Sequence, residues 1–307
     1  MPDRILVIKL GALGDFLLAL GPMQAIRRHH AGAKITLLTR PAYHALAAAS
    51  GLFDAIHLDP TPRLNPFAWL ALRRWLLGTG FRRVYDLQTS DRTAGYFRLF
   101  WPGPWPEWSG KVAGCSHRHL YAEPNTLHTV DRQRAQLALA GIEDVPLADL
   151  GFLDAPVEHL VPNGRLALLI PGASATRPVK RWPAERYGAL AQRLAAEGLT
   201  PLVIGGPDAA AAAAVITRIE PSAVDLIGRT DHGQLAALTR RATMAIGNDT
   251  GPTHLAALAG CPTLALFSAD SDPERTAPRG PSVALLQRDD LADLTVDTVM
   301  EALPHSD

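Results

Sequence analysis

The residues best suited to chemistry lie in three polar turns, each placed directly after a short apolar run. The first turn is Gly11-Ala-Leu-Gly14-Asp15 and ends in a carboxylate. Its glycine spacing differs from the dinucleotide-binding fingerprint, and no Lys-Ser/Thr pair follows Gly14 as in a P-loop. Two interpretations of Asp15 stay open. Its residue type favours a helix N-cap, whereas its place after a strand fits a general base at the mouth of a cleft.

The second turn runs from Pro171 to Pro183 and carries Ser174, Thr176 and Lys180. Small hydroxyls and fixed cations in such a turn suit a phosphate group. A solvated basic loop anchored by Trp182 is an equally good interpretation of the same residues.

The third turn, Asn248-Asp-Thr-Gly-Pro-Thr-His254, is the most specific of the three. A helix expected from Leu255 to Ala259 follows it, and the free amides at a helix start attract anions. The threonine hydroxyls add donors. The competing interpretation is a capped helix with a structural histidine. A weaker glycine pair, Gly205-Gly206, could admit a nucleotide close to the backbone or form an ordinary turn.

Short apolar runs separated by helix-length segments must position these turns. This alternation predicts an α/β fold of two Rossmann-like, doubly wound domains. Ligands of such open parallel sheets bind beyond the carboxyl ends of the strands, so the turns are expected to face a cleft between the domains. The runs are 5–8, 35–38, 56–58, 84–87, 166–170, 202–204, 224–227, 244–246 and 264–267.

Helix and strand periodicity fades between Gly151 and Gly164, which places the domain boundary there. The predicted domains are 1–155 and 156–307, with the alternative that the last helix, near 295–303, packs back on the first domain.

The composition excludes several classes of protein. Thirty basic residues balance thirty acidic ones, which argues against a non-specific nucleic-acid binder. Two isolated cysteines argue against a disulfide framework and fit a reducing cytoplasm. The first residues do not follow the plan of a signal peptide, and no apolar run is long enough to span a bilayer. A cytoplasmic protein is therefore expected.

The segment from Thr61 to Trp108 is unusual because it holds five of the six tryptophans. It also holds seven arginines against three acids, a local net charge of +4. This composition fits a surface that faces a membrane or a glycolipid. The alternative, expected for at least half of these side chains, is core packing beneath a long loop.

At these motifs the chain resembles the heptosyltransferases of lipopolysaccharide core assembly, glycosyltransferase family nine. The matching pieces keep the family order across nearly the whole chain, with little match between Pro60 and Asp149. One departure is Phe267-Ser-Ala-Asp-Ser-Asp-Pro273, where the family commonly has Phe-Gly-Pro-Thr-Asp-Pro. The pieces are 5–15, 35–40, 180–183, 205–207, 248–256 and 262–267.

The resemblance implies a GT-B fold and an inverting transfer of heptose from ADP-heptose to a lipopolysaccharide core acceptor, a Kdo-bearing or heptose-bearing lipid A core. It implies acceptor binding by domain 1–155 and donor binding by domain 156–307. No metal and no cofactor are expected, since fixed cations and a helix start would stabilise the leaving diphosphate. The alternatives are another nucleotide sugar (a hexose, or a UDP or GDP donor) on a different glycan, a sugar-nucleotide epimerase, and a non-catalytic binder.

The same resemblance assigns individual roles and favours the base for Asp15. Peripheral association with the inner face of the cytoplasmic membrane is a further expectation. The expected catalytic residues are Asp15 and Lys180; the donor site adds Ser174, Thr176, Gly205, Gly206, Asp249, Thr250, Gly251, Thr253 and His254; the acceptor site holds Gly11, Gly14 and Arg40.

Overall fold

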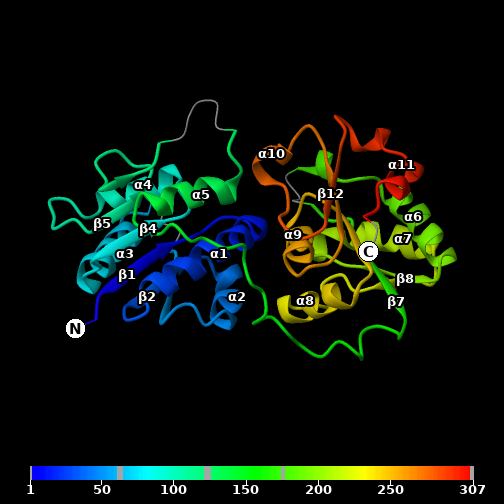
Figure 1. Ribbon diagram of the computed structural model, residues 1–307, viewed down its shortest axis with the longest axis horizontal. Helices are drawn as coiled ribbons and strands as arrows, with labels where there is room; N and C mark the ends of the chain where they lie inside the picture. The colour runs from blue at the N-terminus through cyan, green and yellow to red at the C-terminus, as the bar shows by residue number, and fades with distance from the viewer. Residues whose placement is uncertain (1, 61–64, 121–125, 174–176, 305–307) are drawn as a thin grey trace. The chain divides into compact units, whose positions relative to one another are not determined.

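The computed structural model describes residues 2–60, 65–120, 126–173 and 177–304. The chain divides into two compact units, Met1–Ala148 and Asp149–Asp307. The division lies a few residues before the boundary placed from the sequence. Each unit is a parallel sheet flanked by helices (Figure 1).

The first unit contains a six-stranded parallel sheet in the order β3-β2-β1-β4-β5-β6. Ile5 to Ile8 of its central strand β1 form an unbroken apolar run, because helices cover both faces of such a sheet. The strands are β1 (Arg4–Ile8), β2 (Lys34–Thr39), β3 (Ala55–Leu58), β4 (Arg83–Asp86), β5 (Glu107–Gly110) and β6 (His117–Arg118). The helices are α1 (Leu13–His29), α2 (His44–Ala49), α3 (Pro66–Thr79), α4 (Asp91–Arg98) and α5 (Thr129–Ala138), with a 3-10 turn η1 (Pro41–Tyr43).

The second unit repeats this topology with the order β12-β11-β10-β7-β8-β9. Its strands are β7 (Arg165–Ile170), β8 (Leu199–Val203), β9 (Val224–Asp225), β10 (Met244–Asn248), β11 (Thr263–Phe267) and β12 (Val283–Gln287). The helices are α6 (Ala184–Ala196), α7 (Ala210–Ile219), α8 (His232–Arg241), α9 (Gly251–Leu258), α10 (Pro273–Thr276) and α11 (Val296–Glu301). Single-turn 3-10 helices are η2 (Pro178–Lys180), η3 (Pro207–Ala209) and η4 (Leu291–Asp293).

Both sheets have a doubly wound strand order, with the first strand of each unit beside its fourth. The strand order reverses between β1 and β4 in the first unit and between β7 and β10 in the second. Ligands of such folds bind at this switch point, beyond the carboxyl ends of the two strands. The predicted fold class is confirmed.

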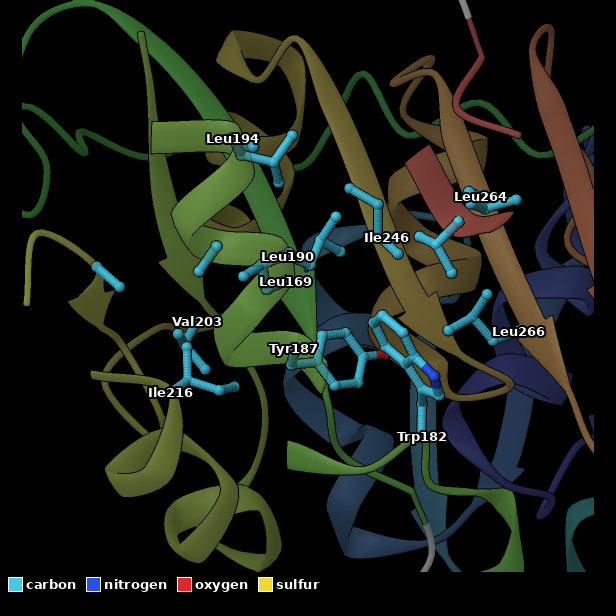
Figure 2. Packing of buried hydrophobic residues seen from close by; sticks show 14 of the residues in the cluster. Leu169, Trp182, Tyr187, Leu190, Leu194, Val203, Ile216, Ile246, Leu264 and Leu266 are labelled. Carbon is cyan, nitrogen blue, oxygen red and sulfur yellow. The ribbon is translucent and has the colours of Figure 1, made fainter. Parts of the chain in front are cut away.

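The core of the second unit gathers apolar side chains of β7, β8, β10 and β11 around α6 (Figure 2). Trp182 and Tyr187 are fully buried there, with ring centroids 4.8 Å apart in an edge-to-face arrangement. The last helix α11 packs against α6, and Val299 and Leu303 join this core.

The tryptophan-rich segment is divided between core and surface. Trp108 is fully buried in the core of the first unit, and Trp69 and Trp75 pack against that core. Trp101 and Trp105 are 71% and 43% exposed. Core packing therefore accounts for more than half of these tryptophans, as expected, and leaves two for a surface.

The sequence analysis did not predict three of the short strands, β5, β6 and β12. β5 mixes glutamate, serine and glycine with one tryptophan, and β12 is a partly exposed edge strand. Helix α1 runs unbroken through Pro22. None of the helices in the described ranges is long and apolar enough to cross a membrane.

Candidate functional site

Asn248 organises the switch point of the second unit from the end of β10. Its buried side-chain oxygen accepts hydrogen bonds from the Trp182 backbone and the Tyr187 hydroxyl, both at 3.1 Å. Its amide nitrogen donates to the carbonyls of Pro171 at 2.8 Å and Gly172 at 3.3 Å. One neutral amide thus ties the 171–183 turn to β10, and Figure 2 shows the two aromatic rings at this end of the core.

The third polar turn is itself the start of a helix. α9 begins at Gly251, earlier than the sequence pattern suggested, and Thr250 is its N-cap residue without a side-chain capping bond. Within the described residues, the backbone N–H groups of Thr250 and Gly251 have no hydrogen-bond acceptor. Two amides and the positive end of the helix dipole are therefore open to an anion.

A buried ion pair lies beside this helix start. Lys180 Nζ is 2.8 Å from Asp249 Oδ2, and their side chains are 13% and 11% exposed. Ser271 Oγ donates to the same carboxylate oxygen at 2.7 Å, and His254 Nε2 lies 3.5 Å from the other oxygen.

The charges of this cluster are fixed by its contacts. Burial alone would raise the pKa of Asp249, but hydrogen bonds from His254, Lys180 and Ser271 outweigh it and hold that pKa well below its usual value. The carboxylate stays ionised and holds the ammonium group in place. A lysine ammonium has three N–H donors, so two remain for a ligand. The cluster can therefore bind an anion such as a diphosphate.

Thr253 supports the turn instead of offering a free hydroxyl. It is fully buried, and its Oγ1 donates to the carbonyl of Asn248 at 2.7 Å. A Cβ on Gly247 would lie 2.4 Å from that oxygen, so only glycine fits there. The prediction that the Thr253 hydroxyl is a free hydrogen-bond donor for a ligand is therefore wrong. His254 is also buried, and within the described part of the chain its Nδ1 has no hydrogen-bond partner.

Gly205 and Gly206 follow β8, which neighbours β7, so they lie at the same edge of the sheet as Lys180. A side chain at either glycine would crowd atoms of the same turn. A Cβ on Gly206 would be 2.9 Å from Asp208 Oδ1, and one on Gly205 would be 3.2 Å from Ala209 Cβ. A role in nucleotide binding stays a prediction. Ser174 and Thr176 lie outside the described residues.

In the first unit, Asp15 does not cap its helix. Ala12 occupies the N-cap of α1. Asp15 lies in the first turn of the helix and is partly exposed, whereas the preceding Gly14 is buried. The N-cap interpretation is therefore wrong. A carboxylate in the first turn still interacts favourably with the helix dipole. A Cβ on Gly11 would approach both Asp15 Oδ2 and Gln88 Oε1 to 3.2 Å, so these two side chains converge on Gly11.

Two side-chain contacts link the residues that follow β1 to those that follow β4. Lys9 is buried, and its Nζ donates to the carbonyl of Leu87 at 3.3 Å. Gln88 Oε1 accepts from the backbone N–H of Leu10 at 2.8 Å. Burial lowers the pKa of Lys9, while the nearby Asp15 and Asp86 carboxylates act in the opposite direction.

Asp86 is the buried carboxyl at the end of β4. Its Oδ1 accepts from the backbone N–H groups of Gln88 at 3.1 Å and Thr89 at 2.9 Å. Burial raises its pKa to about 6, although these hydrogen bonds and the Lys9 charge lower it. Thr89 has a φ of +48°, a left-handed conformation that is uncommon outside glycine. The turn after β4 is thus held by Asp86.

Arg40 follows β2 at the same edge of the first sheet and is exposed. Tyr43 stacks on Phe16 with ring centroids 5.2 Å apart. Burial raises the pKa of Tyr43, and the charges of Arg40 and Asp15 act on it in opposite directions. The charges of Arg40 and Asp15 thus both act on the hydroxyl of Tyr43.

Sequence reasoning missed Gln88, Tyr43 and Ser271. Gln88 directly follows an apolar run, the signal that identified the other turns, and Ser271 lies in the segment that departs from the family pattern. Over the ranges that the structure describes, no group of three or more His, Cys, Asp or Glu side chains could hold a metal ion.

Comparison with known proteins matches this chain to one family. The model described as glycosyltransferase family 9 (heptosyltransferase) matches residues 69–295. Lipopolysaccharide core heptosyltransferase OpsX of Haemophilus influenzae is 23% identical over 296 residues, which cover 90% of this chain and 82% of that protein.

Solved structures show the same fold. A glycosyltransferase of family 9 from Veillonella parvula superposes with a TM-score of 0.80 at 20% identity, covering 98% of this chain and 95% of its own. Escherichia coli heptosyltransferase WaaC, solved with ADP and with ADP-2-deoxy-2-fluoro heptose, gives a TM-score of 0.75 at 20% identity, covering 97% and 98%. The chain therefore belongs to glycosyltransferase family 9, the heptosyltransferases.

Proposed function

We propose that this protein transfers a heptose from ADP-heptose to a hydroxyl of a lipopolysaccharide core acceptor, with inversion at the anomeric carbon. The observation that carries the proposal is the Lys180–Asp249 pair beside the open amides of α9, in a chain of this family. This cluster suits the diphosphate of the donor. The ADP complexes of WaaC and the name of OpsX support the choice of donor and acceptor.

The proposed reaction is a single displacement. Asp15 removes the proton of the acceptor hydroxyl as its oxygen bonds to the anomeric carbon. The bond from that carbon to the β-phosphate oxygen breaks, and ADP leaves with the electron pair. Lys180 and the amides of Thr250 and Gly251 stabilise the developing charge on the leaving diphosphate. These fixed groups supply the positive charge, so we propose a metal-independent reaction.

Purified protein with ADP-heptose and either a Kdo-bearing or a heptose-bearing lipid A core tests the proposal. In the presence of EDTA, we expect the acceptor mass to rise by one heptose residue and ADP to appear in equal amount. Transfer only from a UDP or GDP sugar would overturn the donor. Epimerisation of a sugar nucleotide without transfer would overturn the reaction class.

We further propose that the protein works in the cytoplasm and associates peripherally with the inner face of the membrane through an aromatic and basic surface of the first unit. Phe67 and Leu70 on α3 are 80% and 47% exposed. Arg73 of the same helix donates to the carbonyl of the exposed Trp101 at 3.0 Å, which joins the helix to the loop before β5.

The same loop borders a hollow of about 380 Å³ that Phe97, Arg98 and Trp105 help to line. Aromatic rings and guanidinium groups together favour the interface of an anionic bilayer. Co-sedimentation with phosphatidylglycerol vesicles, but not with phosphatidylcholine vesicles, is the expected result, reduced in Trp101→Ser. Equal recovery with both vesicles, or none, would contradict the membrane proposal and leave the transfer reaction untouched.

A further inference from the structure

We propose that Gln88 is an acceptor-positioning residue, which donates a hydrogen bond to an oxygen of the acceptor sugar beside the reacting hydroxyl. This inference rests on the proposed function, because it takes Asp15 as the base. Gln88 lies at the switch point of the first sheet, directly after β4, and is partly exposed.

The hydrogen bond to the backbone fixes the orientation of the Gln88 amide. The N–H of Leu10 is a donor, so the atom that meets it at 2.8 Å must be the oxygen Oε1. The nitrogen Nε2 then carries two N–H donors. Within the described part of the chain, no acceptor meets either of them. A side chain with one end fixed and two unused donors is preorganised for a ligand oxygen.

The position of Gly11 puts this amide next to the base. Asp15 Oδ2 and Gln88 Oε1 both lie 3.2 Å from the point where a Cβ of residue 11 would be. A side chain at residue 11 would crowd both groups. A sugar carries hydroxyls on adjacent carbons, so one hydroxyl can meet Asp15 while a neighbouring oxygen accepts from Gln88 Nε2.

Two buried charged groups, Asp86 and Lys9, hold the turn that carries Gln88. The Asp86 carboxyl accepts from the backbone N–H groups of Gln88 and Thr89, and Thr89 keeps its left-handed φ of +48°. Lys9 Nζ donates to the carbonyl of Leu87 on the other side. Residues held in uncommon backbone conformations by surrounding bonds cluster at functional sites. The amide of Gln88 is therefore aimed by its backbone as well as by Leu10.

Gln88→Glu is the variant that separates positioning from structure. The glutamate keeps an oxygen for the Leu10 N–H but loses the Nε2 donors. We expect the KM for a Kdo-bearing or heptose-bearing lipid A core to rise about tenfold or more, the loss of one good hydrogen bond. The KM for ADP-heptose should stay within about twofold, and the melting temperature should match that of the wild type. Gln192→Glu, at an exposed position of α6, is the control for the same substitution outside the site.

Gln88→Met separates the lost donor from the added charge. It has no charge and no donor, and it also loses the Leu10 bond. The acceptor KM should rise in both variants, whereas the acid limb of the kcat pH profile should move only in Gln88→Glu, because only its carboxylate repels Asp15. An unchanged acceptor KM in Gln88→Glu would overturn the inference.

Asp15→Asn in the same assay distinguishes this inference from the proposed function. If wild-type protein transfers heptose and Asp15→Asn does not, while Gln88→Glu keeps its acceptor KM, only the Gln88 role fails. If wild-type protein transfers heptose to neither acceptor, the proposed function fails and the inference with it.

Discussion

The two switch points have the same strand order, but different types of side chain hold the turns around them. In the second unit, the neutral amide of Asn248 joins β10 to the turn after β7 through three hydrogen bonds and to Tyr187 of α6 through a fourth. In the first unit, the buried charged groups Lys9 and Asp86 occupy the equivalent place beneath Gln88. Topology thus fixes where a site forms, and the side chains decide its charge.

The groups that each switch point offers to a ligand also differ in charge. The first unit presents the Asp15 carboxylate, a group that accepts a proton. The second presents Lys180 and the start of α9, which attract an anion. This contrast predicts a division of labour. Substitutions in the first site should act on turnover and acceptor, and those in the second on the nucleotide diphosphate.

The largest expected effect is on turnover. Asp15→Asn removes the proposed base, and kcat should fall by about 10²- to 10⁴-fold, the usual contribution of a positioned base. Affinity for ADP should stay within about twofold, because no group of the second unit changes. Steady-state kinetics and calorimetry check both parts. Weakened ADP binding in Asp15→Asn would break the division between the two sites.

The next largest effect concerns stability. Asn248→Ala leaves the Trp182 N–H and the carbonyls of Pro171 and Gly172 without this partner, while the Tyr187 hydroxyl keeps only the Ile170 carbonyl. The free energy of unfolding should therefore drop by about 3 kcal/mol. Urea unfolding measures it. Asn65→Ala, at an exposed helix N-cap, is the control and should cost about 1 kcal/mol. Equal losses in the two variants would show that the Asn248 amide does not hold the second switch point.

The third effect, at most as large as the second, is a pH dependence of stability confined to the first unit. Burial raises the pKa of Asp86 from its ordinary value of 3.8 to about 6, so the folded state keeps the proton to higher pH. Its contribution to stability is full below about pH 4 and is lost as the pH rises through 6, by roughly 3 kcal/mol at most.

Asp86→Asn keeps the oxygen that accepts from Gln88 and Thr89 but does not titrate. The stability of this variant relative to wild type should therefore increase between pH 4 and pH 6. Urea unfolding at several pH values would show it. A constant difference across that range would mean that Asp86 is not the titrating group.

The sequence predicted much of this molecule because its signals are local. Unbroken apolar runs identified β1, β7 and β11, since buried parallel strands need them. The Lys180–Asp249 contact joins residues far apart in the chain, so residue types suggested its chemistry but not the pairing. The mixed strand β5 carries too little apolar periodicity to be found. The missed strand β12 does contain an apolar run, Val283 to Leu286, and so carried the signal that identified the other strands. Thr253 looked like a free hydroxyl because only tertiary packing buries it.

We propose that the cluster formed by Lys180, Asp249 and the start of α9 binds the nucleotide diphosphate. The most direct test of this proposal is calorimetric titration of ADP, with UDP and GDP beside it, in EDTA. The variants are Lys180→Ala, the double variant Lys180→Ala with Asp249→Asn, and Arg193→Ala as a surface-charge control. We predict selective ADP binding that weakens about 10- to 100-fold in Lys180→Ala, the loss of a charged hydrogen bond. The control should be unaffected, and the double variant should not recover. Unchanged affinity in Lys180→Ala, or full recovery in the double variant, would contradict the claim that Lys180 binds the phosphates.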